Sequence, residues 1–186
     1  MPADPRTDAL FEQAQQLLDQ LKTAIENKDV AAQRLLAVKL AGLETGFKRI
    51  ETTKRVMLAN MMAAVRRATT PDKRRKELLD AFEYTARVRS TAQDDLVDDA
   101  LSAEAEAQLK EIISGLDALK PEGRKALAPF LDSFDLDVRV CAAVALLELM
   151  PDRVIPILRD LVKNAPGTNA GATALATLDE LGKHAK

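Results

Sequence analysis

Residues 131–147 read LDSFDLDVRVCAAVALL. Three aspartates lie within the first seven of these residues, and the remainder is apolar except for Arg139. An aspartate-rich turn that leads into a helix apolar on nearly all sides predicts a helix enclosed by neighbouring helices. The stretch therefore predicts that this part of the chain is helical and packed on several sides.

Short helices are also expected on both sides of this stretch. Pro121 and Pro151 stand where helices begin, and Gly182 stands where the last one stops. The predicted helices are 121–131, 137–149, 151–163 and 169–181.

In the N-terminal half, apolar residues recur at alternating spacings of three and four, which predicts long helices. A first helix is expected over residues 7–26, and Asp29 is the expected N-cap of a second. Thr70 and Pro71 mark the start of a later helix, and an apolar stripe over 105–119 marks another. The second helix carries a heptad seam of Leu36, Leu40, Leu43, Phe47, Ile50, Lys54, Met57, Met61 and Ala64.

Two questions about this seam stay open from the sequence. Gly42 and Gly46 each cost about 1 kcal/mol relative to alanine inside a helix, so the helix either continues or breaks near Gly46. The seam can be filled within the chain or by a second copy, which leaves the oligomeric state open.

The composition indicates an all-α protein of the globular class. Of its 186 residues, 47% are hydrophobic, 30% charged and only 3% aromatic, which favours an aliphatic helical core. A single cysteine excludes an internal disulfide. The N-terminus shows no signal peptide, and no segment approaches the roughly 20 apolar residues of a membrane span. We therefore expect a cytoplasmic protein without a membrane partner.

Charge is strongly segregated, although the net charge is only −2. Residues 48–89 contain twelve Lys and Arg against five Asp and Glu, and residues 93–122 contain two against nine. A basic segment and an acidic neighbour each form a candidate surface for a partner of opposite charge, and they can also pair with each other inside the fold.

The C-terminal third resembles HEAT-like repeats, in which an aspartate follows one helix and the next opens with Val-Arg and two alanines. Here these are Asp132, Val138-Arg139 and Ala142-Ala143. The resemblance implies that Asp132 caps the following helix or turn. It also implies stacked antiparallel helix pairs over residues 119–186, an architecture that usually binds other macromolecules. We expect these HEAT-like hairpins to pack against an N-terminal bundle of long helices, residues 1–118, so that the two regions form one continuous structural unit.

More narrowly, residues 119–182 resemble a small bacterial family of HEAT-like domains whose genes often lie beside polymorphic toxin genes. The resemblance rests on residues 123–127, Leu131-Asp132, Val138-Arg139, Ala142-Ala143 and 149–151. Members are regarded as immunity proteins, so it implies a protein that neutralises a cognate toxin by occluding its active site.

The acidic segment is the first candidate for contact with such a partner. We expect it to cover a cationic site on a toxin domain through Asp94, Asp95, Asp98, Asp99, Glu104 and Glu106. Carboxylates four residues apart on a helix also suit Mg²⁺, but the chain carries no second acidic motif and few aromatic residues for an enzyme of that kind.

The basic segment supports an alternative function, nucleic-acid binding, because clustered Lys and Arg neutralise phosphates. The candidate contacts are Arg66, Arg67, Lys73, Arg74, Arg75 and Lys76.

No residue pattern indicates catalysis. Cys141 lies in the most apolar helix and is expected to be a small buried hydrophobe, and His184, the single histidine, stands two residues from the C-terminus. We therefore expect no enzymatic activity and no catalytic, metal or cofactor site.

Overall fold

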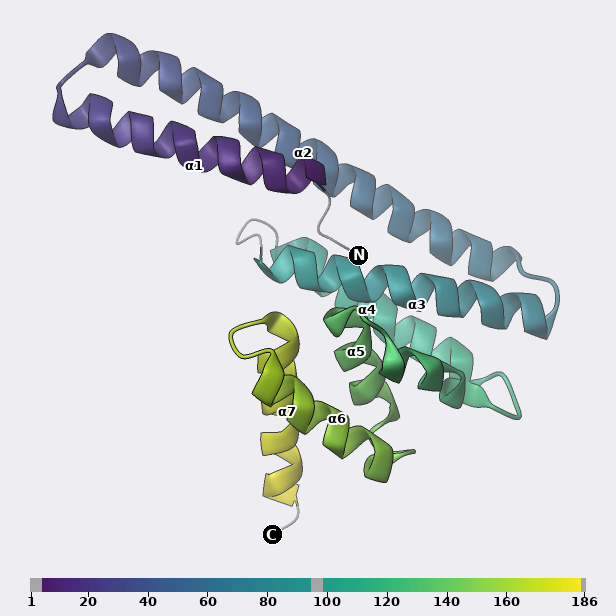
Figure 1. Cartoon of the computed structure of the whole chain (residues 1–186). Helices are drawn as coiled ribbons and strands as arrows, with labels where there is room; N and C mark the ends of the chain where they lie inside the picture. The colour runs from purple at the N-terminus through teal and green to yellow at the C-terminus, as the bar shows by residue number, and fades with distance from the viewer. Residues whose placement is uncertain (1–4, 95–98, 185–186) are drawn as a thin grey trace. The chain divides into compact units, whose positions relative to one another are not determined.

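The computed structural model describes residues 5–94 and 99–184, and all its regular elements are helical (Figure 1). This confirms the predicted all-α fold. No helix in the described part of the chain is both long and apolar enough to cross a membrane. The elements are α1 (Pro5–Glu26), α2 (Val30–Arg67), α3 (Pro71–Asp94), α4 (Asp99–Asp117), the 3-10 helix η1 (Gly123–Asp132), α5 (Leu136–Leu146), α6 (Pro151–Asn164) and α7 (Asn169–His184).

The chain forms two compact units, unit 1 (Met1–Val56) and unit 2 (Met57–Lys186), and α2 contributes to both. The boundary between our two predicted regions, at residue 118, falls inside unit 2. The reason is that a single core in unit 2 combines residues from both sides of that position, such as Phe82 and Ile112 with Val138 and Leu158.

Unit 1 is a hairpin of α1 and the first part of α2. The predicted N-cap is confirmed, because the Asp29 carboxylate accepts a hydrogen bond from the Ala32 N–H at 3.0 Å. The helix continues through Gly46 without a break. A Cβ added at Gly46 would lie 3.5 Å from the Leu10 side chain, so α1 packs closely there. The core consists of Leu17, Ala24, Leu36 and Leu43, with Leu10, Ala14, Leu21, Ala32, Leu40 and Phe47 packed against it.

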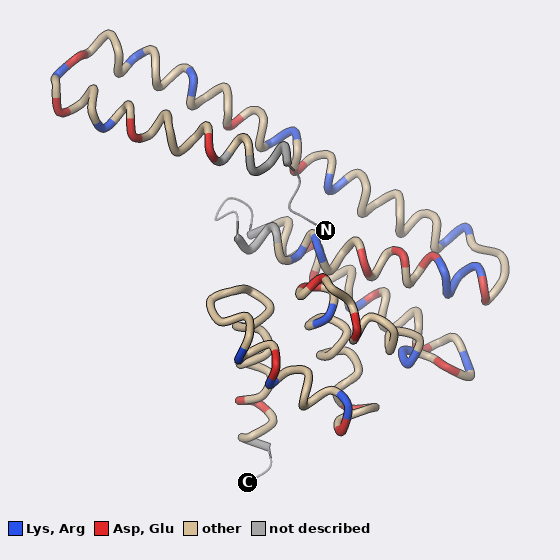
Figure 2. Tube along the Cα trace, in the orientation of Figure 1, with Lys and Arg blue, Asp and Glu red and all other residues tan. Residues whose placement is uncertain are grey.

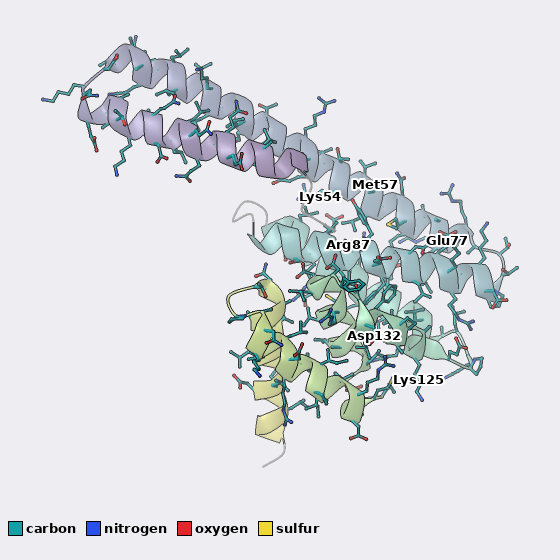
Figure 3. The ribbon with its side chains drawn as sticks, in the orientation of Figure 1. Lys54, Met57, Glu77, Arg87, Lys125 and Asp132 are labelled. Atoms are coloured by element: carbon teal, nitrogen blue, oxygen red, sulfur yellow. The ribbon has the colours of Figure 1, made fainter. Side chains whose placement is uncertain are left out.

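The second half of the predicted α2 seam is shifted by one residue. Met57, labelled in Figure 3, lies on α2. It is 43% exposed, whereas Leu58 is fully buried and Met62 is 4% exposed. Leu58 packs with Val88 and Leu101, so the end of α2 turns a different face to its neighbours in unit 2. A heptad pattern alone does not indicate where a long helix changes neighbours.

In unit 2, α3 and α4 lie side by side, η1 packs against α5, and α6 packs against α7 (Figure 1). Thr70 caps α3 as predicted, since its hydroxyl accepts a hydrogen bond from the Lys73 N–H at 3.3 Å. Residues 123–132 form a 3-10 helix instead of the expected α-helix. Pro129 inside it has no N–H to donate, which disfavours an α-helical hydrogen-bond pattern there.

The cap of α5 differs from the one that the HEAT resemblance implies. Asp135, not Asp132, accepts hydrogen bonds from the N–H groups of Asp137 and Val138, at 3.1 and 3.3 Å. Asp132 is exposed and pairs with Arg153 at 2.8 Å. The buried face of α5 agrees with the prediction, because seven of its eleven residues are buried.

Candidate protein-binding pocket

A cavity of about 160 Å³ lies in unit 2 where α3, α4, α5 and α7 meet, and we call it the α5 pocket. Its lining comes from helices that are far apart in the sequence. The residues are Phe82 and Arg89 of α3, Glu106, Leu109, Lys110 and Ile113 of α4, Cys141, Val144 and Ala145 of α5, and Thr173 of α7.

The apolar part of the pocket is rigid because it belongs to the core of unit 2. Phe82 is fully buried and stacks on Phe130 of η1, with ring centroids 5.6 Å apart. Leu109 is 7% exposed and Cys141 is 8% exposed. Val144 is 42% exposed, although its neighbours Ala143 and Ala145 are buried. The pocket therefore presents apolar surface to the outside at Val144.

Charged side chains of both signs surround this apolar surface. Lys110 and Glu106 form an ion pair at 3.1 Å on the exposed face of α4. Arg89 lies on the α3 side, where its guanidinium donates a hydrogen bond to the Cys141 sulfur at 3.9 Å. An exposed ion pair such as Lys110–Glu106 contributes little to stability. The charges of Lys110 and Glu106 are therefore available to a partner.

Cys141 is buried as predicted, and its thiol is a poor nucleophile. Burial raises its pKa to about 11, and the nearby Arg89 charge offsets only part of this effect. A thiol with that pKa stays protonated at neutral pH, while the thiolate is the reactive form. Among the described residues, no group of three or more His, Cys, Asp or Glu side chains could hold a metal ion.

An ion-pair network holds α5 against α3 beside the pocket. Arg87 lies on α3 (Figure 3). Its guanidinium donates hydrogen bonds to Asp135 at 2.8 Å and to Glu83 at 2.6 Å. Burial raises the pKa of Asp135, but hydrogen bonds from Arg87 and from the Val138 N–H lower it by more, so the net shift is downward. Asp135 is therefore ionised at neutral pH and links the start of α5 to α3.

The structure places only part of the predicted acidic surface. Asp95 and Asp98 lie outside the described residues, and so do the side chains of Asp94 and Asp99. Glu104 is partly buried, while Glu106 is exposed and lines the α5 pocket. Glu106 is thus the predicted partner contact that the structure brings next to an apolar cavity.

The α2–α3 turn brings the predicted basic residues together at one end of unit 2 (Figure 2). Two of them pair with the acidic segment: Arg66 lies 3.4 Å from Glu111, and Arg75 lies 3.7 Å from Glu122. The Arg67 guanidinium donates to a backbone carbonyl of its own helix at 3.1 Å. The remaining basic residues, Lys73, Arg74 and Lys76, are exposed.

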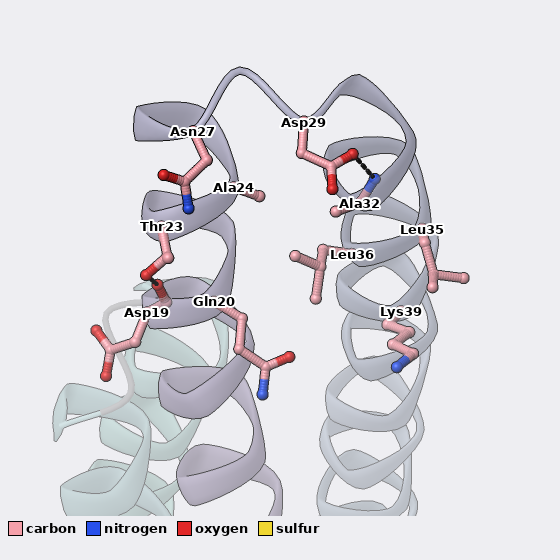
Figure 4. Close-up of a pocket in the computed structure, with 10 residues that line it drawn as sticks. All are labelled: Asp19, Gln20, Thr23, Ala24, Asn27, Asp29, Ala32, Leu35, Leu36 and Lys39. Carbon is pink, nitrogen blue, oxygen red and sulfur yellow. Dashed lines mark hydrogen bonds between the residues drawn. The ribbon is translucent and has the colours of Figure 1, made fainter.

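A second hollow, of about 550 Å³, lies at the tip of unit 1, where α1 ends and α2 begins (Figure 4). It is shallow and open. Polar residues such as Gln20 and Asn27 line the α1 side, and Leu35 and Lys39 line the α2 side.

Sequence reasoning missed Arg89, Val144 and Thr173 as site residues. Arg89 belongs to a basic segment of twelve cations, and nothing in the sequence marks it as the one beside the pocket. Val144 is one of many apolar residues in α5, and nothing in the sequence marks it as the exposed one. Comparison with protein-family models, with curated proteins and with solved structures gives no match to this chain.

Proposed function

We propose that this chain binds another protein, and that the α5 pocket receives a side chain of that partner. The size and lining of the pocket support this proposal. Sites for small molecules typically have volumes of about 300–1,000 Å³, and the α5 pocket has only about 160 Å³. Protein interfaces, in contrast, are anchored by single large side chains that fill apolar pockets ringed by polar residues.

We infer further that the partner is a toxin domain whose active site is covered by the bound chain. This step rests on the family resemblance of residues 119–182. The acidic residues of α4 support it, since Glu106 stands beside the pocket and would face a cationic surface around the toxin's active site. Such charges mainly accelerate association and select the partner.

Co-expression with the products of neighbouring genes tests this function. We expect one of these products to be toxic when expressed alone, to co-purify with this chain, and to lose toxicity in its presence. If no neighbouring product is toxic, or if toxicity persists while both proteins are present in soluble form, the immunity function is wrong.

A matched pair of variants tests the site. Val144→Glu places a charge on the exposed apolar residue of the pocket and should abolish protection. Leu175→Glu makes the same change on α7, at a residue that is 49% exposed and does not line the pocket, and should leave protection intact. Equal protection by both variants would exclude the α5 pocket as the binding site.

The basic end of unit 2 supports nucleic-acid binding as a second candidate function. The observation in its favour is that Lys73, Arg74 and Lys76 are exposed beside Arg66 and Arg67. Binding should weaken steeply with salt, with a slope of log K against log salt of about −0.9 per phosphate contact on duplex DNA. Replacing the three α3 residues by alanine should reduce that slope; absence of an electrophoretic shift at low salt would exclude this function.

A further inference from the structure

Large exposed hydrophobic side chains are concentrated on unit 1. Leu35 is 58% exposed and Val38 is 70% exposed, although both belong to a helix of the hairpin. At about 100° of rotation per residue, Val38 lies about 200° around α2 from the buried Leu36, which accounts for its greater exposure. The core cluster of unit 1 is small, with Leu17, Ala24, Leu36 and Leu43 as its buried members, each 6–8% exposed.

Leu35 and Val38 belong to a second heptad stripe on α2, which we call the outer stripe. It consists of Ala31, Leu35, Val38 and Gly42, at spacings of four, three and four. Successive residues of an α-helix are rotated by about 100°, so the outer stripe faces away from the seam that packs on α1. Figure 4 shows Leu36 pointing toward α1 and Leu35 pointing away from it.

The surface around the outer stripe is open. A Cβ added at Gly42 would meet no atom within 4 Å, so another helix can approach the α2 backbone closely there. Leu35 also lines the hollow of about 550 Å³ at the hairpin tip, which extends the accessible surface beyond the stripe.

The charges beside the outer stripe are positive. Arg34 and Lys39 flank it, both are exposed, and neither forms an ion pair with another described residue. Lys48, nine residues after Lys39 on α2, differs from these two cations because it pairs with Glu44 at 2.6 Å. The outer stripe therefore combines apolar side chains with two uncompensated cations.

We propose that the outer stripe docks an acidic amphipathic helix of a partner protein. A helix with apolar residues at the same spacing would fill the stripe, and carboxylates on its flanks would pair with Arg34 and Lys39. A second copy of α2 fits less well, because antiparallel pairing would bring these cations close to their own equivalents. The stripe spans about 16 Å from residue 31 to residue 42 at 1.5 Å per residue, which matches three turns of a partner helix.

Synthetic peptides test this proposal on the full chain. The probe is a fluorescent helical peptide of about 20 residues, long enough to be helical in water, with Leu at alternating spacings of three and four and Glu at the flanking positions. The control peptide carries Lys in place of Glu. By fluorescence anisotropy, the Glu peptide should bind at least tenfold more tightly than the Lys peptide, and the difference should shrink with salt.

Variants of exposed residues locate the site without disturbing the core. Leu35→Ser with Val38→Ser should weaken binding of the Glu peptide at least tenfold. Arg34→Glu with Lys39→Glu should reverse the preference in favour of the Lys peptide. Leu18→Ser, on a 49% exposed residue of α1 outside the stripe, should have no effect.

Three results would overturn the proposal. These are equal or absent binding of the two peptides, unchanged peptide preference in the charge-reversal variant, or a dimer seen by sedimentation equilibrium that Leu35→Ser with Val38→Ser dissociates. The last result would show that a second copy covers the outer stripe.

Discussion

Replacing Asp135 by alanine should destabilise unit 2 substantially. The change removes two N-cap hydrogen bonds, from Asp137 and Val138, and the hydrogen-bonded ion pair with Arg87. Losing an N-cap typically costs about 1 kcal/mol, and losing a hydrogen bond to a charged group costs about 1.5–3 kcal/mol. Arg87 keeps Glu83 as a partner and is 30% exposed, so the lower end of the second range applies. We expect a loss of roughly 2–3 kcal/mol in the free energy of unfolding.

Asp132→Ala is the matched control. Asp132 lies three residues earlier, is the cap that the HEAT resemblance implies, and pairs with Arg153 through side chains that are 74% and 42% exposed. Exposed pairs contribute about 0–1 kcal/mol, so this variant should behave almost like the parent protein.

Urea unfolding followed by tyrosine fluorescence measures both effects. Tyr84 is the only tyrosine, the chain has no tryptophan, and Tyr84 packs against Leu58 and Leu101 in unit 2. With a typical dependence of about 1–3 kcal/mol per molar urea, Asp135→Ala should lower the midpoint by about 0.7–3 M. Because the folded-state pKa of Asp135 is lowered, its contribution is present at neutral pH and is lost as the pH falls below about 4. Equal midpoints for the two variants, or a larger effect of Asp132→Ala, would refute this account of α5.

The other predictions concern glycine positions and the cysteine. Gly42→Ala should stabilise unit 1 by up to about 1 kcal/mol, because the added Cβ meets no atom within 4 Å. Circular dichroism during thermal unfolding measures this gain, and a loss of stability would contradict the open space beside Gly42. Gly171→Ala should lower the thermal midpoint of unit 2, because its Cβ would lie 2.2 Å from the Ala165 carbonyl oxygen; an unchanged midpoint would show that this turn can shift freely. Cys141, with a pKa of about 11, should react with a disulfide reagent far more slowly at pH 8 in the native protein than in urea; equal rates would contradict its burial.

Local signals in the sequence predicted the helices well. Asp29, Thr70 and Pro71 mark helix starts through hydrogen bonds and backbone geometry confined to a few residues, so they hold in the structure. The cap of α5 was predicted wrongly because Asp132 and Asp135 are both aspartates before the same helix. Asp135 is the cap because α5 begins at Leu136, directly after it, and it also accepts a hydrogen bond from Arg87, which is 48 residues away.

Long-range packing explains what the sequence could not predict. The shift from Met57 to Leu58 as the buried residue of α2 reflects the position of Val88 and Leu101, which pack on it. The α5 pocket likewise depends on four helices whose relative positions no single segment encodes. Glu106 could be proposed because acidic residues are concentrated in its segment, while Val144 carries no comparable signal.

The central claim is that this chain binds its partner through the α5 pocket, and the affinity of pocket variants for that partner tests it most directly. The measurement is isothermal titration of the partner that co-purifies with the chain, which we propose to be a toxin domain. It is titrated with the parent protein, Val144→Glu and Leu175→Glu, after circular dichroism has shown that all three are folded. Anchor residues at the centre of an interface contribute about 2 kcal/mol or more, so we predict that Val144→Glu weakens binding at least thirtyfold and that Leu175→Glu leaves it unchanged. Equal affinity of both variants for the toxin domain would contradict the claim that this chain binds its partner through the α5 pocket.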